Sequence, residues 1–145
     1  MRAVIQRVSK AKVSVKAKII GQIGSGLLVF IAIHKDDDQK DIDYLVNKIA
    51  NLRIFADGDE YFQKSVLDLN KEILIISQFT LYGECKKGRR PDFFQASSPK
   101  LAKNLYNAFV DKFKETGLKV AEGEFQAMMD VELTNEGPVT LILDS

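Results

Sequence analysis

The sequence is short of the residues on which most metal and redox chemistry depends. Its 145 residues include one cysteine, one histidine and no tryptophan. Protein metal centres draw on clustered cysteine, histidine or carboxylate ligands, and Cys85 has no second cysteine in the chain with which to form a disulfide. We therefore expect no metal, no cofactor and a reducing, cytoplasmic location.

Long apolar runs and an excess of one charge are also missing. The longest apolar run, residues 27–33, has seven residues, whereas a membrane-spanning helix needs about 20. The N-terminal stretch MRAVIQRVSK mixes basic with apolar residues, unlike a signal peptide. The formal net charge is +1, so no overall field attracts nucleic acid. A soluble protein without membrane partners is expected, and any contact with a polyanion would be local.

What the sequence does contain is a set of short segments rich in Val and Ile, together with two amphipathic segments. The predicted strands are residues 3–8, 12–17, 18–23, 27–33, 72–79, 118–123, 124–133 and 138–145. One predicted helix is capped by Asp37 or Asp38, and the other begins at Ser98 and Pro99 and stops at Gly117. No linker divides the chain, so residues 1–145 are expected to form a single α/β domain with a mostly antiparallel or mixed sheet.

Conventional nucleophilic chemistry has little support in the sequence. His34 is the only imidazole and would have to be the base of any Ser-His-Asp arrangement. A surface histidine at the end of a strand is the preferred interpretation. Cys85, beside two lysines, is interpreted as an inert loop thiol rather than a nucleophile.

Three polar stretches remain as candidates. SQFTLYG, residues 77–83, places hydroxyl and amide side chains where an apolar strand ends, and strand ends often carry sites. KKGRRP, residues 86–91, is either a solvated loop or a local contact for phosphate groups. The Gly-Pro pair at 137–138 predicts a turn before the last strand.

These stretches belong to a larger resemblance. MRAVIQRV, GSGLLVFIAI, NLRIF, SQFTLYG, KKGRRPDF and NEGPVTLILDS, in this order from Met1 to Ser145, resemble the D-aminoacyl-tRNA deacylase family. The resemblance implies the fold of that family, a barrel-like sheet with two main helices. It also implies a cytosolic homodimer that hydrolyses the ester between a D-amino acid and the 3′-terminal adenosine of tRNA, and that removes glycine mischarged on tRNA for alanine. The alternative is a non-catalytic dimeric module that binds nucleic acid.

The resemblance also implies roles for individual residues. The wall that holds the adenosine and the reacting carbonyl would consist of Ser77, Gln78, Phe79 and Thr80. In the family the Gly-Pro peptide bond is cis and is inserted from one subunit into the active site of the other, so Gly137 and Pro138 would form a chiral filter that Arg7 braces. Thr80 is expected to position the substrate, because no base accompanies it.

The remaining implied residues line the pocket or contact the tRNA backbone. The pocket residues are Phe125, Ala127 and Met129, and the residues for the tRNA backbone are Lys86, Lys87, Arg89 and Arg90. Gln126 departs from the family, which usually has glycine there, and this difference leaves the shape of the pocket open.

Overall fold

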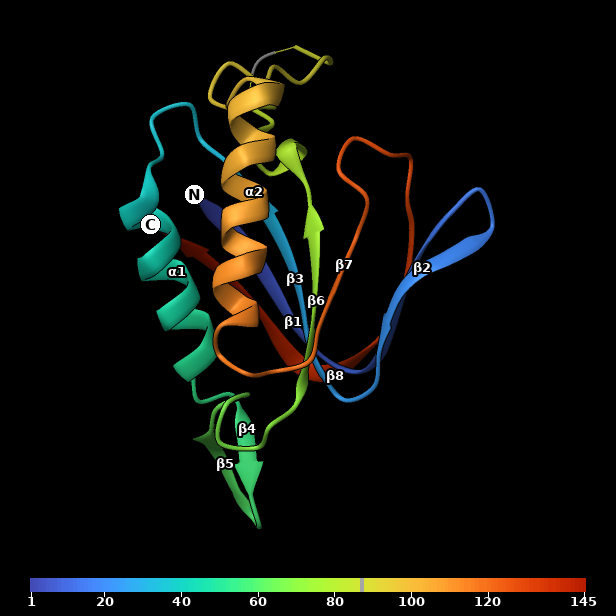
Figure 1. The fold of residues 1–145 in the computed structure, drawn as a ribbon, viewed down its shortest axis with the longest axis vertical. Coiled ribbons are helices and arrows are strands. Elements are labelled where there is room, and N and C mark those ends of the chain that lie inside the picture. Colours follow the sequence, from blue (N-terminus) through green and yellow to red (C-terminus); the bar gives the residue numbers. More distant parts are fainter. Residues whose placement is uncertain (87) are drawn as a thin grey trace.

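A mixed β-sheet forms the centre of the structure, and two helices pack side by side on one of its faces (Figure 1). The structure is a computed structural model that describes residues 1–86 and 88–145. The elements, in chain order, are β1 (Arg2–Val15), β2 (Lys18–Ile23), β3 (Gly26–Ala32), α1 (Gln39–Asn51), β4 (Phe55–Asp57), β5 (Glu60–Lys64), β6 (Glu72–Ser77), the 3-10 helix η1 (Phe79–Tyr82), α2 (Pro99–Lys114), β7 (Val120–Glu122) and β8 (Asp130–Asp144).

The strand order explains why the sheet curls. Strands β3, β6 and β7 run parallel, and β1 is antiparallel to β3. Along one edge β1 pairs with β8, and along the other it pairs first with β3 and then with β2. The two ends of the path β2-β1-β3-β6-β7 approach each other, because a Cβ added to Gly21 of β2 would lie 2.8 Å from the carbonyl oxygen of Glu122 in β7. The mixed sheet is therefore nearly closed into a barrel, as predicted.

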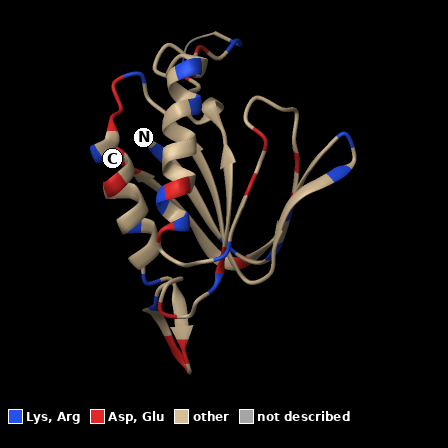
Figure 2. Ribbon diagram, viewed as in Figure 1, with Lys and Arg blue, Asp and Glu red and all other residues tan. Residues whose placement is uncertain are grey.

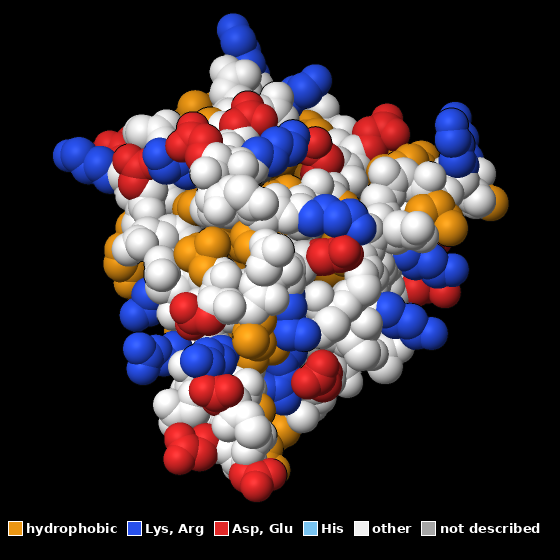
Figure 3. Space-filling model, turned by 60° about the horizontal axis from the view of Figure 1, so that its bottom comes forward, with side chains coloured by type: hydrophobic (Ala, Val, Ile, Leu, Met, Phe, Trp, Pro, Cys, Tyr) orange, Lys and Arg blue, Asp and Glu red, His pale blue; other side chains and the backbone are white. Residues whose placement is uncertain are grey.

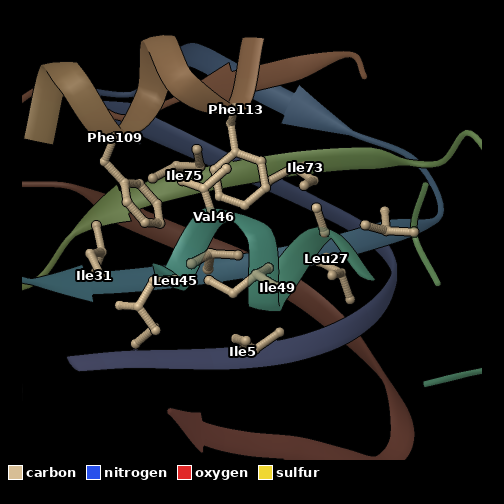
Figure 4. Packing of buried hydrophobic residues seen from close by; sticks show 14 of the residues in the cluster. Ile5, Leu27, Ile31, Leu45, Val46, Ile49, Ile73, Ile75, Phe109 and Phe113 are labelled. Carbon is tan, nitrogen blue, oxygen red and sulfur yellow. The ribbon is translucent and has the colours of Figure 1, made fainter. Parts of the chain in front are cut away.

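The main core lies between the helices and the sheet. Figure 4 shows side chains from α1 and α2 packed against side chains from β1, β3 and β6. Among the fully buried residues are Ile5, Leu27, Ile31, Leu45, Ile49, Ile73, Phe109 and Phe113. A second cluster, which includes Val8, Leu28, Leu74 and Ile76, fills the inside of the curled sheet. Both faces of the central strands are thus covered, which agrees with their continuous apolar sequences.

Both helices were predicted, and their ends show which signals set them. Asp38 caps α1 in a capping box with Asp41, whereas Asp37 binds the N-terminal amine of Met1 at 2.6 Å. Pro99 is the first residue of α2, but Ser98 makes no capping bond through its side chain. Helix α2 ends at Lys114, and the left-handed Gly117 (φ 81°) follows in the turn.

The strand predictions need four corrections. Residues 3–8 and 12–17 are not two strands, because β1 continues through both and turns at Lys16 and Ala17. The turn at 58–59 joins a hairpin, β4–β5, that was not predicted. The predicted strand 72–79 ends at Ser77. The predicted strands 124–133 and 138–145 are replaced by β8, which passes through the Gly-Pro pair without ending.

Charges of both signs are distributed over the surface. On the face that Figure 3 shows, Lys and Arg are interspersed with Asp and Glu, and apolar side chains lie between them. Across residues 1–86 and 88–145, no helix combines the length and apolar character needed to cross a membrane.

Candidate functional site

The carboxyl ends of the parallel strands meet at one edge of the sheet. Strand β3 pairs with β6 up to Ile31 and Ser77, and β6 pairs with β7 up to Ile75 and Glu122. The segments that follow these strands therefore start next to one another, in the place where α/β proteins usually build ligand sites. Residues 77–80 lie at this edge.

The wall residues change from strand to 3-10 helix within two residues. Gln78 still bonds to the sheet, since its N–H donates to the carbonyl of Ile31 at 2.8 Å. The chain then turns into η1, where the N–H of Leu81 donates to the carbonyl of Gln78 at 3.1 Å. This change of direction leaves Phe79 and Thr80 exposed at the surface. The backbone N–H groups of Phe79 and Thr80 open the 3-10 helix, where no carbonyl of the same helix can accept from them.

The side chain of Thr80 is paired with an amide rather than a base. The Nε2 atom of Gln78 donates a hydrogen bond to Thr80 Oγ1. The titratable group in η1 is the buried Tyr82, whose ring packs edge-on against the ring of His34 with 5.3 Å between centroids. Burial, followed by the nearby Asp37 carboxylate, raises the pKa of Tyr82 to about 12. Tyr82 is therefore protonated at neutral pH and does not act as a base there.

The pocket residues Phe125, Ala127 and Met129 lie in a turn, not in the predicted strand 124–133. The N–H of Ala127 donates to the carbonyl of Glu124 at 3.1 Å, and Gln126 has a left-handed backbone with φ 64°. Phe125 packs toward the helices, 5.8 Å from the ring of Tyr106, whereas Met129 packs in the cluster inside the curled sheet. The segment therefore wraps around the end of the sheet, and this turn replaces the alternation of a strand.

The Gly-Pro pair lies in a bulge of β8. Gln6 pairs with Thr140 and Val8 pairs with Asn135, so the four residues 136–139 stand opposite the single residue Arg7. Gly137 and Pro138 are exposed, and the bond between them is cis. A Cβ added to Gly137 would meet only the amide of Asn135, at 3.6 Å. The bulge thus projects from the sheet with free space around its tip.

Arg7 holds the base of this bulge. Arg7 is 8% exposed, and its guanidinium donates to the carbonyls of Glu136 at 3.3 Å, of Gly137 at 3.4 Å and of Ile54. The carboxylate of Glu136 lies 3.3 Å from Arg7 Nε. The carboxamide of Asn135 crosses the neck of the bulge and, with its nitrogen toward the backbone, donates to the carbonyls of Val139 and Arg7. These contacts fix the bulge to β1 and to the segment before β4.

The bulge and the wall lie at opposite ends of the sheet within one chain. Arg7 pairs with Leu27 at the start of β3, and Ser77 pairs with Ile31 near its end. Four residues of extended strand separate these positions by about 13 Å. A hollow of about 590 Å³, lined by residues such as Lys10, Lys12, Glu72 and Lys119, lies near the bulge end and away from the wall. One chain therefore does not bring the two predicted halves of the site together.

The basic loop follows the wall directly. Lys86, Arg89 and Arg90 are exposed, and Figure 2 shows basic residues in this loop and in the first turns of α2. Lys86 lies 3.7 Å from Glu84. Lys87, which was also predicted to contact tRNA, lies outside the described residues.

Two contact partners of the predicted site residues Phe79 and Arg7 were missed in the sequence. The ring of Phe93 packs edge-on against Phe79 at 5.0 Å, and the only signal for it was an aromatic pair next to the basic loop. The carbonyl of Ile54, which accepts from Arg7, has no sequence signal, because every residue carries the same backbone group.

Comparison with known proteins identifies relatives along the whole chain. A family model described as D-Tyr-tRNA(Tyr) deacylase matches residues 4–144. The D-aminoacyl-tRNA deacylases of Aquifex aeolicus and Halothermothrix orenii are 60% and 57% identical over 145 residues, which cover 100% of this chain and 98% and 97% of theirs.

Two solved structures share the fold. A c-Myc DNA unwinding element binding protein superposes with a TM-score of 0.93 at 42% identity and covers 100% of this chain and 99% of its own. A probable eukaryotic D-amino acid tRNA deacylase superposes with a TM-score of 0.86 at 21% identity and covers 99% and 98%.

Proposed function

The chain belongs to the D-Tyr-tRNA(Tyr) deacylase family and is an enzyme that hydrolyses D-aminoacyl-tRNA, and from this premise we propose that its active site is completed by two copies of the chain. The observation that carries the proposal is the separation of the wall, residues 77–80, from the Gly-Pro bulge, residues 136–139. They lie at opposite ends of one sheet. In a symmetric pair of chains, the bulge of each can enter the wall of the other.

In this proposal the wall positions the ester for attack by water. An aminoacyl ester is already activated, so orientation and stabilisation of the oxyanion account for most of the catalysis. The backbone N–H groups of Phe79 and Thr80 are the proposed oxyanion donors. Water adds to the ester carbonyl, the bond to the ribose oxygen breaks, and the products are a free amino acid and tRNA with a 3′-hydroxyl group. Thr80 keeps a positioning role because its oxygen is already bonded to Gln78.

The bulge is proposed to exclude L-substrates. In an L-aminoacyl ester the side chain and the α-hydrogen exchange places relative to the D form. A rigid backbone placed where the L side chain would project therefore rejects the L-substrate by steric clash. Arg7 supports this role because it holds the carbonyls of Glu136 and Gly137 in one orientation. Glycine has no side chain to clash, so the same filter would admit glycine mischarged on tRNA for alanine.

An uncovered part of the sheet supports the homodimer. On the face away from the helices, Ile142, Val4 and Phe30 form one cross-strand row, in which Ile142 is 66% exposed and the other two are partly exposed. This row lies between the bulge end and the wall end of the sheet. A second copy that covered it would bury apolar surface and bring each bulge toward the opposite wall. Such a dimer would act in the cytoplasm, where aminoacyl-tRNA is used.

A complementation experiment tests whether the bulge acts between chains. One variant, Gly137→Val, adds a branched side chain at the exposed tip of the bulge, where it would occupy the facing wall and block the substrate. The other variant, Gln78→Ala with Phe79→Ala, alters the wall. Each alone should be inactive on D-tyrosyl-tRNA. When the two are unfolded together and refolded as a 1:1 mixture, each mixed dimer should contain one intact wall facing one intact bulge. Random pairing then restores about a quarter of the parent activity.

The controls separate the possible failures. Each variant refolded alone must stay inactive and keep the mass of the parent in light scattering. If the bulge acted on the wall of its own chain, no mixed dimer would hold a complete site and the mixture would stay inactive. That result would refute the proposal.

A further inference from the structure

A β-turn beside the wall displays an aromatic side chain to solvent. The N–H of Ala96 donates to the carbonyl of Phe93 at 3.0 Å, so Phe94 and Gln95 form the tip of the turn. Phe94 is 84% exposed. Exposure of a large apolar ring forgoes the free energy of burying it, so this position calls for an explanation other than packing within the chain.

The turn is anchored on both sides. Before the tip, the ring of Phe93 packs against Phe79 of the wall at 5.0 Å. After the tip, the carbonyl of Gln95 accepts from the N–H of Lys35 at 3.1 Å, and Ala96 pairs with His34. At the tip itself, a carboxylate oxygen of Asp92 accepts from the N–H of Phe94 at 3.4 Å. Phe94 is therefore held next to Phe93, the residue that contacts the wall directly.

The charges around the turn favour an anionic partner. Arg89 and Arg90 are exposed in the loop that leads to the turn, and neither forms a salt bridge among residues 1–86 and 88–145. Lys35, next to the turn, is also exposed. Asp92 and Glu84 lie in the same loop, and Glu84 pairs with Lys86. The chain as a whole carries a net charge of only +1, so this cluster is a local feature.

We propose that Phe94 stacks on a base of the unpaired nucleotides that precede the terminal adenosine of the aminoacyl-tRNA, while Arg89 and Arg90 contact the adjacent phosphates. An exposed aromatic ring beside cationic side chains is the usual arrangement for binding single-stranded nucleic acid, since every base has a face on which a ring can stack. The inference rests on the proposed function, because it takes the wall as the site of the terminal adenosine. Phe94 then extends that site along the strand.

The test compares a long and a short substrate. D-tyrosyl-tRNA carries the upstream nucleotides, whereas 3′-D-tyrosyl-adenosine lacks them. Phe94→Ala should lower kcat/KM for D-tyrosyl-tRNA roughly tenfold and leave kcat/KM for D-tyrosyl-adenosine within twofold. Phe94→Trp should keep the activity on both. Tyr61→Ala is the matched control, because Tyr61 is 75% exposed in β5, remote from the basic loop. This variant should leave kcat/KM unchanged for both substrates.

Each other outcome overturns the proposal. If Phe94→Ala left turnover of D-tyrosyl-tRNA unchanged, no stacking contact would exist. An equal loss on both substrates would assign Phe94 to the structure of the wall. A change of mass in light scattering would assign it to an interface between protein chains. Failure of the proposed wall is distinguishable, since it would appear as unimpaired cleavage of D-tyrosyl-adenosine by the Gln78→Ala, Phe79→Ala variant.

Discussion

Replacement of Arg7 by methionine should both destabilise the chain and release the Gly-Pro bulge. Methionine keeps much of the aliphatic stem but removes the guanidinium, which donates to the carbonyls of Ile54, Glu136 and Gly137. Ile54 is 3% exposed, so its carbonyl would lose its partner away from water, at a cost of about 1–3 kcal/mol. The two bulge carbonyls belong to exposed residues and can bond to water instead.

The expected loss in free energy of unfolding is therefore about 2–4 kcal/mol, most of it from the Ile54 side of the guanidinium. A domain of this size typically has about 5–15 kcal/mol of stability, so Arg7→Met should remain folded under assay conditions. Urea unfolding gives the stability, and single-turnover assays on D- and L-tyrosyl-tRNA give the selectivity. We expect the ratio of D- to L-substrate hydrolysis to fall about tenfold, because a bulge without a fixed orientation would no longer reject the L-substrate.

Two matched variants separate the contacts of Arg7. Glu136→Gln removes only the carboxylate at 3.3 Å, whose side chain is 48% exposed, and should cost less than about 1 kcal/mol. Arg7→Lys keeps the charge but not the several N–H donors of the guanidinium. Its free energy of unfolding should therefore lie between those of the parent and Arg7→Met. If Arg7→Met lost less than about 1 kcal/mol and kept the D-to-L ratio of the parent, the bracing role would be refuted.

Three further predictions address the wall, the turn and the ends of the chain. Thr80→Ala should slow turnover of D-tyrosyl-tRNA only modestly, and acyl-enzyme trapped on Thr80 in rapid-quench experiments would refute its positioning role. Gln126→Gly should raise the free energy of unfolding by about 0.5–1 kcal/mol, because glycine removes the steric strain of a left-handed residue at φ 64°. Gln126→Ala is the control, since alanine keeps that strain, and an equal gain in this variant would contradict the reason. The hydrogen bond from Arg2 lowers the pKa of Asp144 below 3.8. The ionised Asp144 therefore contributes to the free energy of unfolding above that pH, and this contribution is lost as the pH falls through the lower pKa of the folded state. Urea unfolding from pH 6 to pH 2 should show this loss in the parent, and an identical pH profile in Asp144→Asn would contradict it.

The parts of the fold that the sequence predicted are those with a local signal. The apolar spacing from Ile42 to Ile49 defines the buried side of α1, and Pro99 marks the first residue of α2. The apolar run at 27–33 identified β3, since a strand covered on both faces needs no alternation. In each case the residues that carry the signal lie in the element itself.

The parts that were missed depend on distant partners. The Gly-Pro pair predicted a turn before a separate last strand. The structure instead places a bulge there within one strand, because β8 resumes pairing with β1 at Thr140 and Gln6. Residues 124–129 were predicted as strand because of their apolar content. Phe125 and Met129 instead fill two clusters on opposite sides of the sheet, and only the assembled sheet reveals that requirement.

In the candidate site, too, the sequence revealed the residues but not the contacts that they make with distant parts of the chain. Composition alone left the hydroxyls of residues 77–80 without a base, and only the resemblance to a family gave them a role. The structure adds a hydrogen bond between Gln78 and Thr80, which holds the two side chains of the candidate wall in a fixed relation to each other without a base. The contacts of Arg7 with Ile54 and the bulge are made to backbone carbonyls, which no pattern of side chains encodes.

The location of the bulge suggests why a chiral filter would be built inside a long strand rather than in a loop. Discrimination by steric clash depends on the position of a few backbone atoms to within about 0.5 Å. A four-residue excursion between Asn135 and Thr140, both paired with β1, has its two ends fixed by the sheet, and Arg7 fixes its base. A surface loop with the same sequence would be more mobile, so its backbone atoms would not keep the position that distinguishes an L- from a D-substrate. The fixed bulge has a second consequence for the proposed dimer. Because the bulge lies about 13 Å along β3 from the wall of its own chain, we expect a partner copy to enclose the substrate.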